Sequence, residues 1–207
     1  MAKAAGRPPR SKTDILEIRS KIAKNALKIY RAEGFGAVSM RRLAKEVGCA
    51  PMTIYAHFEG KTDILRYLWA DVLAEMSDEI QKELTLIVVP VERLQRAAQT
   101  FVSYWITHPD HFRLVFMSND VTRADVSKFI MDDKTLVHFR MFADLIQDVL
   151  PDDREVKAKT DTLISGMIGI ALCINTIRDY PWSDATMMTN RLLTGIIPTT
   201  DGVSQPC

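Results

Sequence analysis

The sequence predicts an all-α fold, and three observations support this prediction. Apolar residues recur at steps of three and four along most of the chain, which is the period of an amphipathic helix. Glycines and prolines separate the segments that show this pattern. Runs of strand-like composition, such as LTLIVVP, are short and isolated. The 207 residues are 47% hydrophobic and 26% charged, which is typical of a globular protein with one large or two small domains.

The first expected helix lies within TDILEIRSKIAKNALKIYRAEG. Apolar residues at helical spacing form its buried stripe: Ile15, Ile18, Ile22, Ala26 and Ile29. Thr13 or Asp14 can cap its start, because a short polar side chain accepts a hydrogen bond from a free N–H of the first turn. The helix is expected to end at Gly34.

Two short helices follow within SMRRLAKEVGCAPMTIYAHF. Ser39 is the expected N-cap of the first helix, and Gly48 is its expected left-handed stop. The buried face of this helix comprises Leu43, Ala44 and Val47. Pro51 suits the first position of the next helix, whose inward-facing residues, Ile54 and Phe58, are one turn apart.

Longer helical segments make up the rest of the chain. Residues 61–84 have a broad apolar face, formed by Ile64, Leu65, Leu68, Trp69, Val72, Leu73, Met76 and Ile80. After Pro90, helical patterns cover roughly 91–107, 109–118, 122–130, 134–149, 153–179 and 184–196. The residues that break these patterns are Pro109, Asn119, Pro151 and Pro181.

Basic residues are concentrated in the N-terminal third of the chain. Residues 1–62 contain 13 Lys and Arg against 5 Asp and Glu, a charge of +8, whereas the rest carries −7 and the whole chain +1. Such polarity favours a polyanion at one end of the molecule. The cysteines Cys49, Cys173 and Cys207 lack disulfide or metal spacing, and no signal peptide or membrane span is evident, so a cytoplasmic location is expected.

Residues 39–58 have the pattern of a helix-turn-helix motif, whose second helix places its N-terminal residues against base edges in the major groove. The exposed residues of that helix are expected to be Met52, Thr53, Tyr55, Ala56 and His57. Lys61 begins the next helix, where the helix dipole disfavours a cation. A phosphate held by the Lys61 ammonium and the free N–H groups of that helix would account for this placement.

The segment AEGFGAVSMRRLAKEVGCAPMTIYAHFEGKTDIL, residues 32–65, resembles the TetR family of transcriptional regulators. The features that match are Gly-Phe, Leu-Ala, Val-Gly and Thr-Ile-Tyr-x-His-Phe, followed by the lysine two residues after Glu59. The resemblance implies an all-α protein with an N-terminal three-helix DNA-binding head that contains the helix-turn-helix. It also implies a C-terminal helical domain for ligand binding and dimerisation.

The resemblance implies a set of DNA-binding residues: Ser39, Arg41, Arg42, Pro51, Met52, Thr53, Tyr55, His57 and Lys61. Most of these would hold the phosphate backbone. Arg41 and Arg42 are the expected polar readers of bases, since a guanidinium can pair bidentately with guanine. The sequence departs from the family at Arg42, where an acidic or polar residue is common, and at Gly60, which replaces a Ser or Asn cap. Because Pro51 and Met52 offer few donors, thymine methyl contacts and DNA shape are expected to carry much of the specificity.

The N-terminal segment GRPPRSK allows two interpretations that the sequence leaves equally open. Arginines flanked by prolines stay extended and suit the adjacent minor groove. The same composition is typical of a disordered, solubilising tail.

The C-terminal domain contains many large, adaptable side chains, which suit a cavity for an apolar or aromatic ligand. The candidate pocket residues are Phe101, Trp105, Phe112, Phe116, Met117, Phe139, Phe142 and Met167. Each of these alone is better explained as core, whereas the group favours a pocket. The candidate dimer interface is formed by Ile164, Ile168, Leu172, Leu192, Leu193 and Ile196. The small residues Gly166, Gly169 and Ala171 would allow helices to approach closely there.

Two other classes of protein fit the sequence less well. An all-helical enzyme or metal-binding protein with a helix-turn-helix-like corner would need a catalytic motif or a ligand cluster, and neither G-x-S-x-G, a phosphate loop nor H-E-x-x-H is present. His108, Asp110 and His111 lack a distant third partner, and Asp110 is expected to support a helix start instead. A non-specific architectural protein would leave the acidic body without a role.

The sequence thus predicts a ligand-responsive, sequence-specific DNA-binding regulator, a repressor rather than an enzyme. The expected parts are a flexible basic arm (1–12), a helix-turn-helix domain (13–60), a ligand-binding and dimerisation domain (61–197) and a frayed tail (198–207). The expected partners are a palindromic double-stranded DNA operator, a small-molecule effector and a second copy of the chain. No cofactor, metal or membrane is expected.

Overall fold

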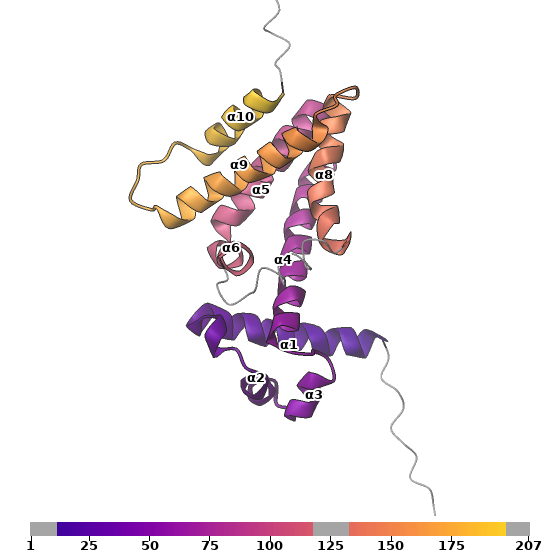
Figure 1. Cartoon of the computed structure of the whole chain (residues 1–207), viewed down its shortest axis with the longest axis vertical. Coiled ribbons are helices and arrows are strands. Elements are labelled where there is room, and N and C mark those ends of the chain that lie inside the picture. The colour runs from indigo at the N-terminus through magenta and orange to yellow at the C-terminus, as the bar shows by residue number, and fades with distance from the viewer. Residues whose placement is uncertain (1–11, 118–132, 198–207) are drawn as a thin grey trace, which may run out of the picture. The chain divides into compact units, whose positions relative to one another are not determined.

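The computed structural model describes residues 12–117 and 133–197, and all regular structure in these ranges is helical (Figure 1). The elements are α1 (Lys12–Glu33), the 3-10 helix η1 (Phe35–Ala37), α2 (Met40–Val47), α3 (Pro51–Tyr55), α4 (Lys61–Leu84), α5 (Pro90–Thr107), α6 (Pro109–Phe116), α8 (Asp133–Val149), α9 (Val156–Thr176) and α10 (Ala185–Ile196). The prediction of an all-α fold is therefore confirmed. None of the helices in the described ranges has the length and apolar character needed to cross a bilayer.

Some expectations lie outside the described residues. They are the basic arm, apart from Lys12, the helix expected at 122–130 and the tail at 198–207.

The described residues form two compact units that divide within α4. The first unit runs to Trp69 and the second begins at Ala70. The helix α4 begins at Lys61, where the second expected domain starts, and its bounds agree with the predicted range of 61–84. All eight residues of its predicted apolar face are buried.

In the first unit, α1 lies against η1 and α2, and its buried stripe includes Ile22, Ala26 and Ile29 as predicted. Ile15 is an exception, since 39% of it is exposed. The predicted cap is also wrong, because α1 begins at Lys12 and therefore contains Thr13 and Asp14. The Asp14 carboxylate lies in the first turn, where the helix dipole favours an anion.

The helix-turn-helix forms as the sequence predicts. The Ser39 hydroxyl oxygen accepts a hydrogen bond from the Arg42 backbone N–H at 3.3 Å, and this contact caps α2. Gly48 ends α2 with φ of 77°, a left-handed conformation that glycine adopts without steric cost. Pro51 begins α3, while Ile54 and Phe58 are buried. The helix α3 ends at Tyr55, three residues before the predicted end.

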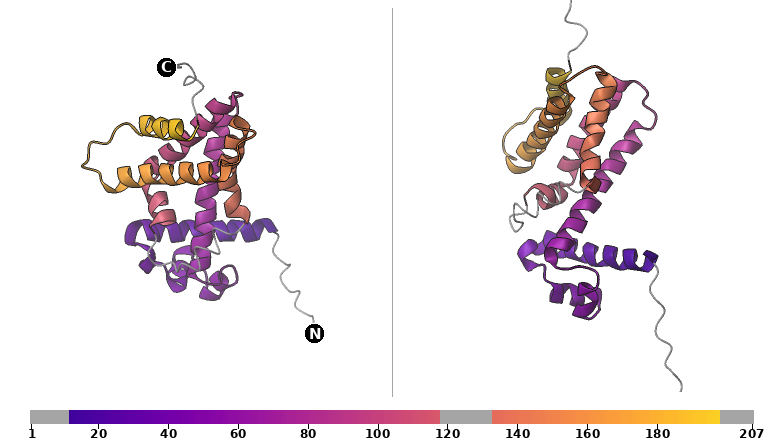
Figure 2. Two further views of the ribbon diagram at one scale, coloured as in Figure 1. Left: turned by 45° about the horizontal axis from the view of Figure 1, so that its top comes forward. Right: turned by 45° about the vertical axis from the view of Figure 1, so that its right-hand side comes forward.

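The second unit is built around α5, which packs against α8, α9 and α10. The two views of Figure 2 show α10 lying alongside α9. Apolar side chains from α5, α8 and α9 form the core, among them Leu94, Phe101, Phe142, Ile146 and Leu163. Burial of such side chains is the main source of stability for a helical bundle.

Gly166 allows α9 to approach α10 closely. A Cβ at this position would lie 2.5 Å from a methyl carbon of Leu192, closer than side chains can pack. The sequence predicted that this small residue would serve contact with a partner chain. In the structure, the side of α9 that carries Gly166 faces α10 of the same chain instead.

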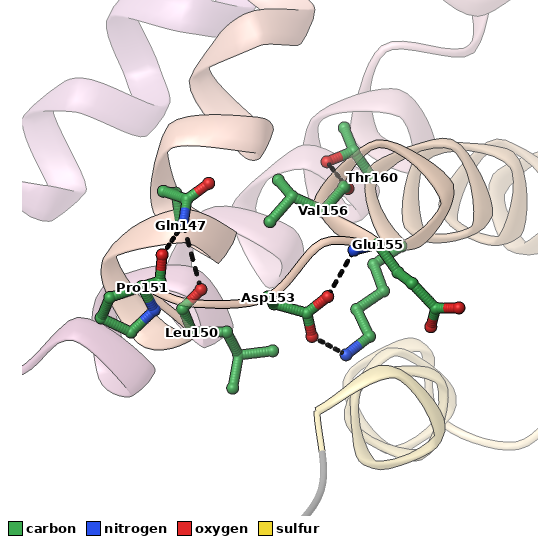
Figure 3. Close-up of polar contacts among 8 residues, drawn as sticks. Gln147, Leu150, Pro151, Asp153, Glu155, Val156 and Thr160 are labelled. Carbon is green, nitrogen blue, oxygen red and sulfur yellow. Dashed lines mark hydrogen bonds and ion pairs between the residues drawn. The ribbon is translucent and has the colours of Figure 1, made fainter.

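A polar turn joins α8 to α9 (Figure 3). One oxygen of Asp153 accepts a hydrogen bond from the Glu155 backbone N–H at 2.6 Å, and the other forms an ion pair with Lys159. These contacts, the Lys159 hydrogen bond above all, lower the pKa of Asp153 below its ordinary value. The Gln147 amide donates to the carbonyls of Leu150 and Pro151. The turn therefore fixes the start of α9 through side chains of both helices.

Candidate nucleic-acid interface

The helix α3 buries one side and exposes the other. Ile54 is fully buried, whereas 76% of Met52 and 53% of Tyr55 are exposed. Pro51 is also exposed, and Thr53, in the middle of the helix, is half-buried. The outer side of α3 therefore offers an apolar group, a hydroxyl and a phenol to a ligand, as the helix-turn-helix pattern predicted.

The two arginines of α2 differ in their surroundings. The Arg42 guanidinium forms a two-pronged ion pair with Glu33 at the end of α1, with one N–O distance of 2.7 Å. This pair lowers the pKa of Glu33 and raises that of Arg42, mainly through the hydrogen bond. Arg41 is exposed and makes no hydrogen bond or ion pair within the described ranges. Of the two predicted readers, Arg41 is thus the one whose donors are available.

His57 is not exposed, contrary to the sequence prediction. Only 9% of it is accessible, because the chain turns inward after Tyr55 and brings Phe58 into the core. The His57 backbone carbonyl accepts a hydrogen bond from the Arg19 guanidinium. The imidazole therefore belongs to the interior of the first unit rather than to its outer surface.

Arg19 joins three parts of the first unit. Besides donating to the His57 carbonyl, its guanidinium carbon lies 4.2 Å from the centre of the Phe58 ring and 5.3 Å from that of Tyr67. The two rings meet edge to face at 5.7 Å. A cation over two aromatic rings thus connects α1, the segment after α3 and the first turns of α4.

Lys61 has a partner inside the first unit. Its ammonium lies 4.3 Å from the centre of the Phe35 ring and 3.4 Å from the Phe35 carbonyl oxygen. This contact offsets the unfavourable helix dipole at the start of α4. A bound phosphate is therefore not needed to account for a lysine at this position, although the half-buried side chain could still meet one.

Arg19, Glu33 and Phe35 were not identified from the sequence as site residues. A signal for Arg19 was present, since it lies three residues before Ile22 and therefore falls on the buried stripe of α1. A cation on an apolar stripe indicates an internal partner. The contacts of Glu33 and Phe35 depend on the tertiary fold and leave no comparable pattern.

The candidate pocket residues cluster in the second unit. Phe101 and Phe142 meet edge to face at 5.5 Å, and Trp105 contacts Phe112 and Phe116 at 6.1 and 5.0 Å. Within the predicted set, Phe101, Trp105, Phe112, Phe142 and Met167 are buried, Phe116 and Phe139 are half-buried, and Met117 is 41% exposed. The rings thus form a continuous aromatic cluster.

The predicted histidines adjoin this cluster. The Tyr104 hydroxyl lies 2.9 Å from His111 Nδ1, and the His108 ring stacks on Tyr104 at 4.5 Å. Asp110 lies in the first turn of α6, where an anion is favoured, as predicted. Within residues 12–117 and 133–197, no group of three or more potential metal ligands lies close together.

The predicted dimer residues divide into two groups. Leu193 and Ile196 are buried within the single chain, so the prediction that they face a partner is wrong. Ile164, Ile168 and Leu192 are half-buried, and 40% of Leu172 is exposed. An open groove of about 570 Å³ lies between α9 and α10 and is lined by Gly166, Ile170, Ser183, Met187, Met188, Arg191 and Leu192.

Residues 22–68 match the model of a family described as bacterial regulatory proteins, tetR family. The match covers most of the first unit, including the whole helix-turn-helix and the start of α4.

Curated relatives are transcriptional regulators as well. An HTH-type transcriptional regulator of Staphylococcus aureus is 24% identical over 172 residues, which cover 74% of this chain and 80% of that protein. The HTH-type transcriptional regulator HbdR of Aromatoleum sp. is 29% identical over 119 residues, 58% of this chain and 52% of that protein.

Solved structures share the fold. A regulator from Pseudomonas aeruginosa superposes with a TM-score of 0.71 at 12% identity, covering 90% of this chain and 92% of that one. FadR of Thermus thermophilus, a TetR-family repressor, superposes with a TM-score of 0.67 at 15% identity, covering 91% and 98%. Together, the family match and the curated relatives identify residues 22–68 as a DNA-binding domain of the TetR type, and they support a DNA-binding transcriptional regulator rather than an enzyme.

Proposed function

We propose that the chain is a cytoplasmic, dimeric repressor that binds a palindromic operator and is released from it by a small apolar or aromatic molecule. The observation that supports its DNA contact most strongly is the exposure of Met52 and Tyr55 on α3, while Ile54 anchors the same helix in the core. Two such helices in a two-fold dimer would reach half-sites about 34–36 Å apart.

In this proposal, the phosphate backbone is held by polar groups around α3, and Arg41 reads a base. Ser39, Thr53, Tyr55 and Lys61 supply the phosphate contacts, since hydroxyl, phenol and ammonium groups suit phosphate oxygens. The Arg41 guanidinium pairs with a guanine in the major groove. Arg42 supports α2 through Glu33, and the His57 imidazole contributes to the fold.

The role of Arg41 as the base-contacting residue can be tested with a panel of operators in which each base pair is changed in turn. Arg41→Ala should weaken operator binding by about 1–3 kcal/mol and abolish discrimination at one position of each half-site. Lys45→Ala, an exposed change on the same helix, is the matched control and should leave every preference in place. An Arg41→Ala protein with unchanged base preferences would exclude Arg41 as the reader.

An apolar effector is supported by the aromatic cluster and by a structural neighbour. FadR of Thermus thermophilus was solved in complex with lauroyl-CoA, so this fold can bind a molecule with a long apolar part. An effector that prefers one conformation of the second unit shifts the equilibrium toward it. The continuous helix α4 joins that unit to the DNA-binding head and would transmit the change.

The release step can be tested by adding apolar compounds to a complex of the protein with its operator. A true effector should raise the melting temperature of the free protein, since it binds the native state, and should weaken operator binding by tenfold or more, a coupling of about 1.4 kcal/mol. Compounds that stabilise the protein and leave operator affinity unchanged would contradict ligand-controlled release.

A further inference from the structure

Trp105 carries a buried polar group that the fold leaves unsatisfied. Its side chain is fully buried, yet the indole Nε1 has no hydrogen-bond partner among the residues that the structure describes. An indole N–H can only donate, and a buried one usually finds an acceptor. The rest of the residue is accounted for, since the Trp105 carbonyl accepts a hydrogen bond from the Asn175 amide at 2.9 Å. The unpaired N–H is therefore a specific feature of this side chain.

The aromatic neighbours of Trp105 offer this N–H no acceptor that is not already engaged. Phe101, Phe112 and Phe116 surround the Trp105 ring with centroid distances of 5.0 to 6.1 Å, and none has a polar atom. The Tyr104 ring is 5.2 Å away, but its hydroxyl is engaged with His111 and the Val72 carbonyl. A single unengaged donor thus lies among aromatic rings, which is the pattern of a ligand site with one orienting contact.

We propose that the Trp105 N–H binds the effector, and that the effector is a neutral apolar or aromatic molecule with an acceptor oxygen, such as a ketone, ester or amide carbonyl. The inference rests on the proposed function, because it names the ligand class for the same repressor. The rings of Phe101, Phe112 and Phe116 around Trp105 could not pair with a carboxylate, and a buried unpaired charge is costly. This argues for a neutral acceptor.

The ligand reaches Trp105 from the side of Phe116. Phe116 is half-buried and the adjoining Met117 is 41% exposed, whereas Phe101 and Phe112 are buried. The Phe116 ring contacts Trp105 at 5.0 Å and must move to admit a molecule to the indole N–H. The ring of a bound aromatic effector would then replace part of that contact.

The test compares compounds of the same skeleton that differ only in the acceptor. Benzophenone and diphenylmethane form one such pair, and ketones or esters with matched hydrocarbons extend the panel. The full chain is labelled with ¹⁵N in its three tryptophans, and titrations follow the indole N–H signals. Each signal is assigned with a Trp→Phe variant. Carbonyl compounds should shift the Trp105 signal and bind roughly three- to tenfold more tightly than their hydrocarbon partners, the effect of one net hydrogen bond.

Trp105→Phe removes the donor and keeps an aromatic ring, so it should abolish the preference for the carbonyl compound. Trp182→Phe is the control, because its Nε1 already donates to the Ile177 carbonyl at 2.9 Å; this variant should keep the preference. If Trp105→Phe does not fold, the shift of the Trp105 indole N–H signal in the wild type tests the proposal. That signal is then assigned as the one that remains in both the Trp69→Phe and the Trp182→Phe variants.

The outcomes separate this inference from the proposed function. Equal binding of carbonyl and hydrocarbon partners, a preference that survives Trp105→Phe, or no binding by any panel member would overturn the role of Trp105. Release from the operator by a charged compound would do the same and leave the proposed function intact. Failure of every class of compound to release the operator would contradict the proposed function itself.

Discussion

At the scale of single residues, side chains around the helix-turn-helix divide into those that the fold holds and those that it leaves exposed. Arg42 is held by Glu33, Lys61 lies on the Phe35 ring and His57 is buried. Arg41 and Tyr55 are exposed. In the proposed function, Arg41 contacts a base, Tyr55 and Lys61 contact phosphates, and Arg42 and His57 support the fold.

The ion pair of Glu33 with Arg42 predicts a pH dependence of stability. The Arg42 hydrogen bond lowers the pKa of Glu33 in the folded state, so the pair stabilises the protein above the ordinary glutamate pKa. That stabilisation is lost as the pH falls through the lowered pKa. In urea unfolding, the wild type should be more stable than Glu33→Gln at pH 7, and the difference should vanish under acid conditions.

Glu17→Gln removes an exposed carboxylate from the same helix and serves as the control. It should not reproduce the pH-dependent difference. A stability difference for Glu33→Gln that is constant from pH 7 into the acid range would show that the ion pair does not contribute.

The residue-level errors of the sequence prediction have a common cause. Arg42 pairs with a residue nine positions away, and the carbonyl of His57 pairs with one 38 positions away. Helical periodicity reports which face of a helix is buried and says nothing of such distant partners. Caps were more predictable, as Ser39 and Gly48 show, because their chemistry is local.

At the scale of elements, the connection between α3 and α4, here called the joint, is stabilised by a side chain of α1. Arg19 reaches from α1 to the His57 carbonyl and to the rings of Phe58 and Tyr67. Tyr55 and Lys61 lie on either side of this joint. The distance between them therefore depends on the Arg19 contacts, in which neither residue takes part.

Loss of the Arg19 contact should loosen the joint. Arg19→Ala should destabilise the protein by about 1–3 kcal/mol, through the lost hydrogen bond and cation–π contacts. It should also weaken binding to all DNA sequences alike, since the phosphate-binding groups lose their spacing. Chemical denaturation and fluorescence anisotropy with specific and random duplexes measure the two effects.

Arg19→Lys is the informative comparison. It keeps a cation near the rings but loses the planar fork, so its effects should be intermediate. Changes in base preference by either variant, or full DNA affinity in Arg19→Ala, would contradict a positioning role.

The helices themselves were largely predictable. The period of apolar residues gave α4 at its observed bounds, and Pro90, Pro109 and Pro151 marked breaks that the fold also has. The early end of α3 was not predicted, because Ile54 and Phe58 are one turn apart and fit a helix equally well. The pattern of apolar residues along the sequence also could not show which helix Gly166 faces.

At the scale of the whole molecule, the proposed dimer requires apolar surface that the single chain does not bury. Large side chains of this kind lie on α9, on α10 and on the segment between them, with exposures of 40% to 67%: Leu172, Ile177, Tyr180 and Met187. Exposed apolar side chains of this size often mark a contact surface. We propose that they form the dimer interface together with Ile164, Ile168 and Leu192.

A charge in this surface should prevent dimerisation. Met187→Glu should shift sedimentation from dimer to monomer, retain helical circular dichroism and reduce operator affinity at least a hundredfold, because two linked heads bind far more tightly than one. Leu86→Glu is a matched control, since Leu86 is 91% exposed in the connection between α4 and α5. A Met187→Glu protein that stays dimeric would place the interface elsewhere.

The central claim is that the first unit binds one DNA site specifically through the exposed side of α3. The most direct measurement is the affinity of the full chain for the DNA upstream of its own coding sequence and for a shuffled duplex, over a range of salt concentrations. The account predicts a Kd of about 10⁻⁸ M or lower, at least a thousandfold preference for the specific duplex, and a log–log salt slope near −0.9 per phosphate contact. Equal affinity for both duplexes, or binding that does not depend on salt, would contradict it.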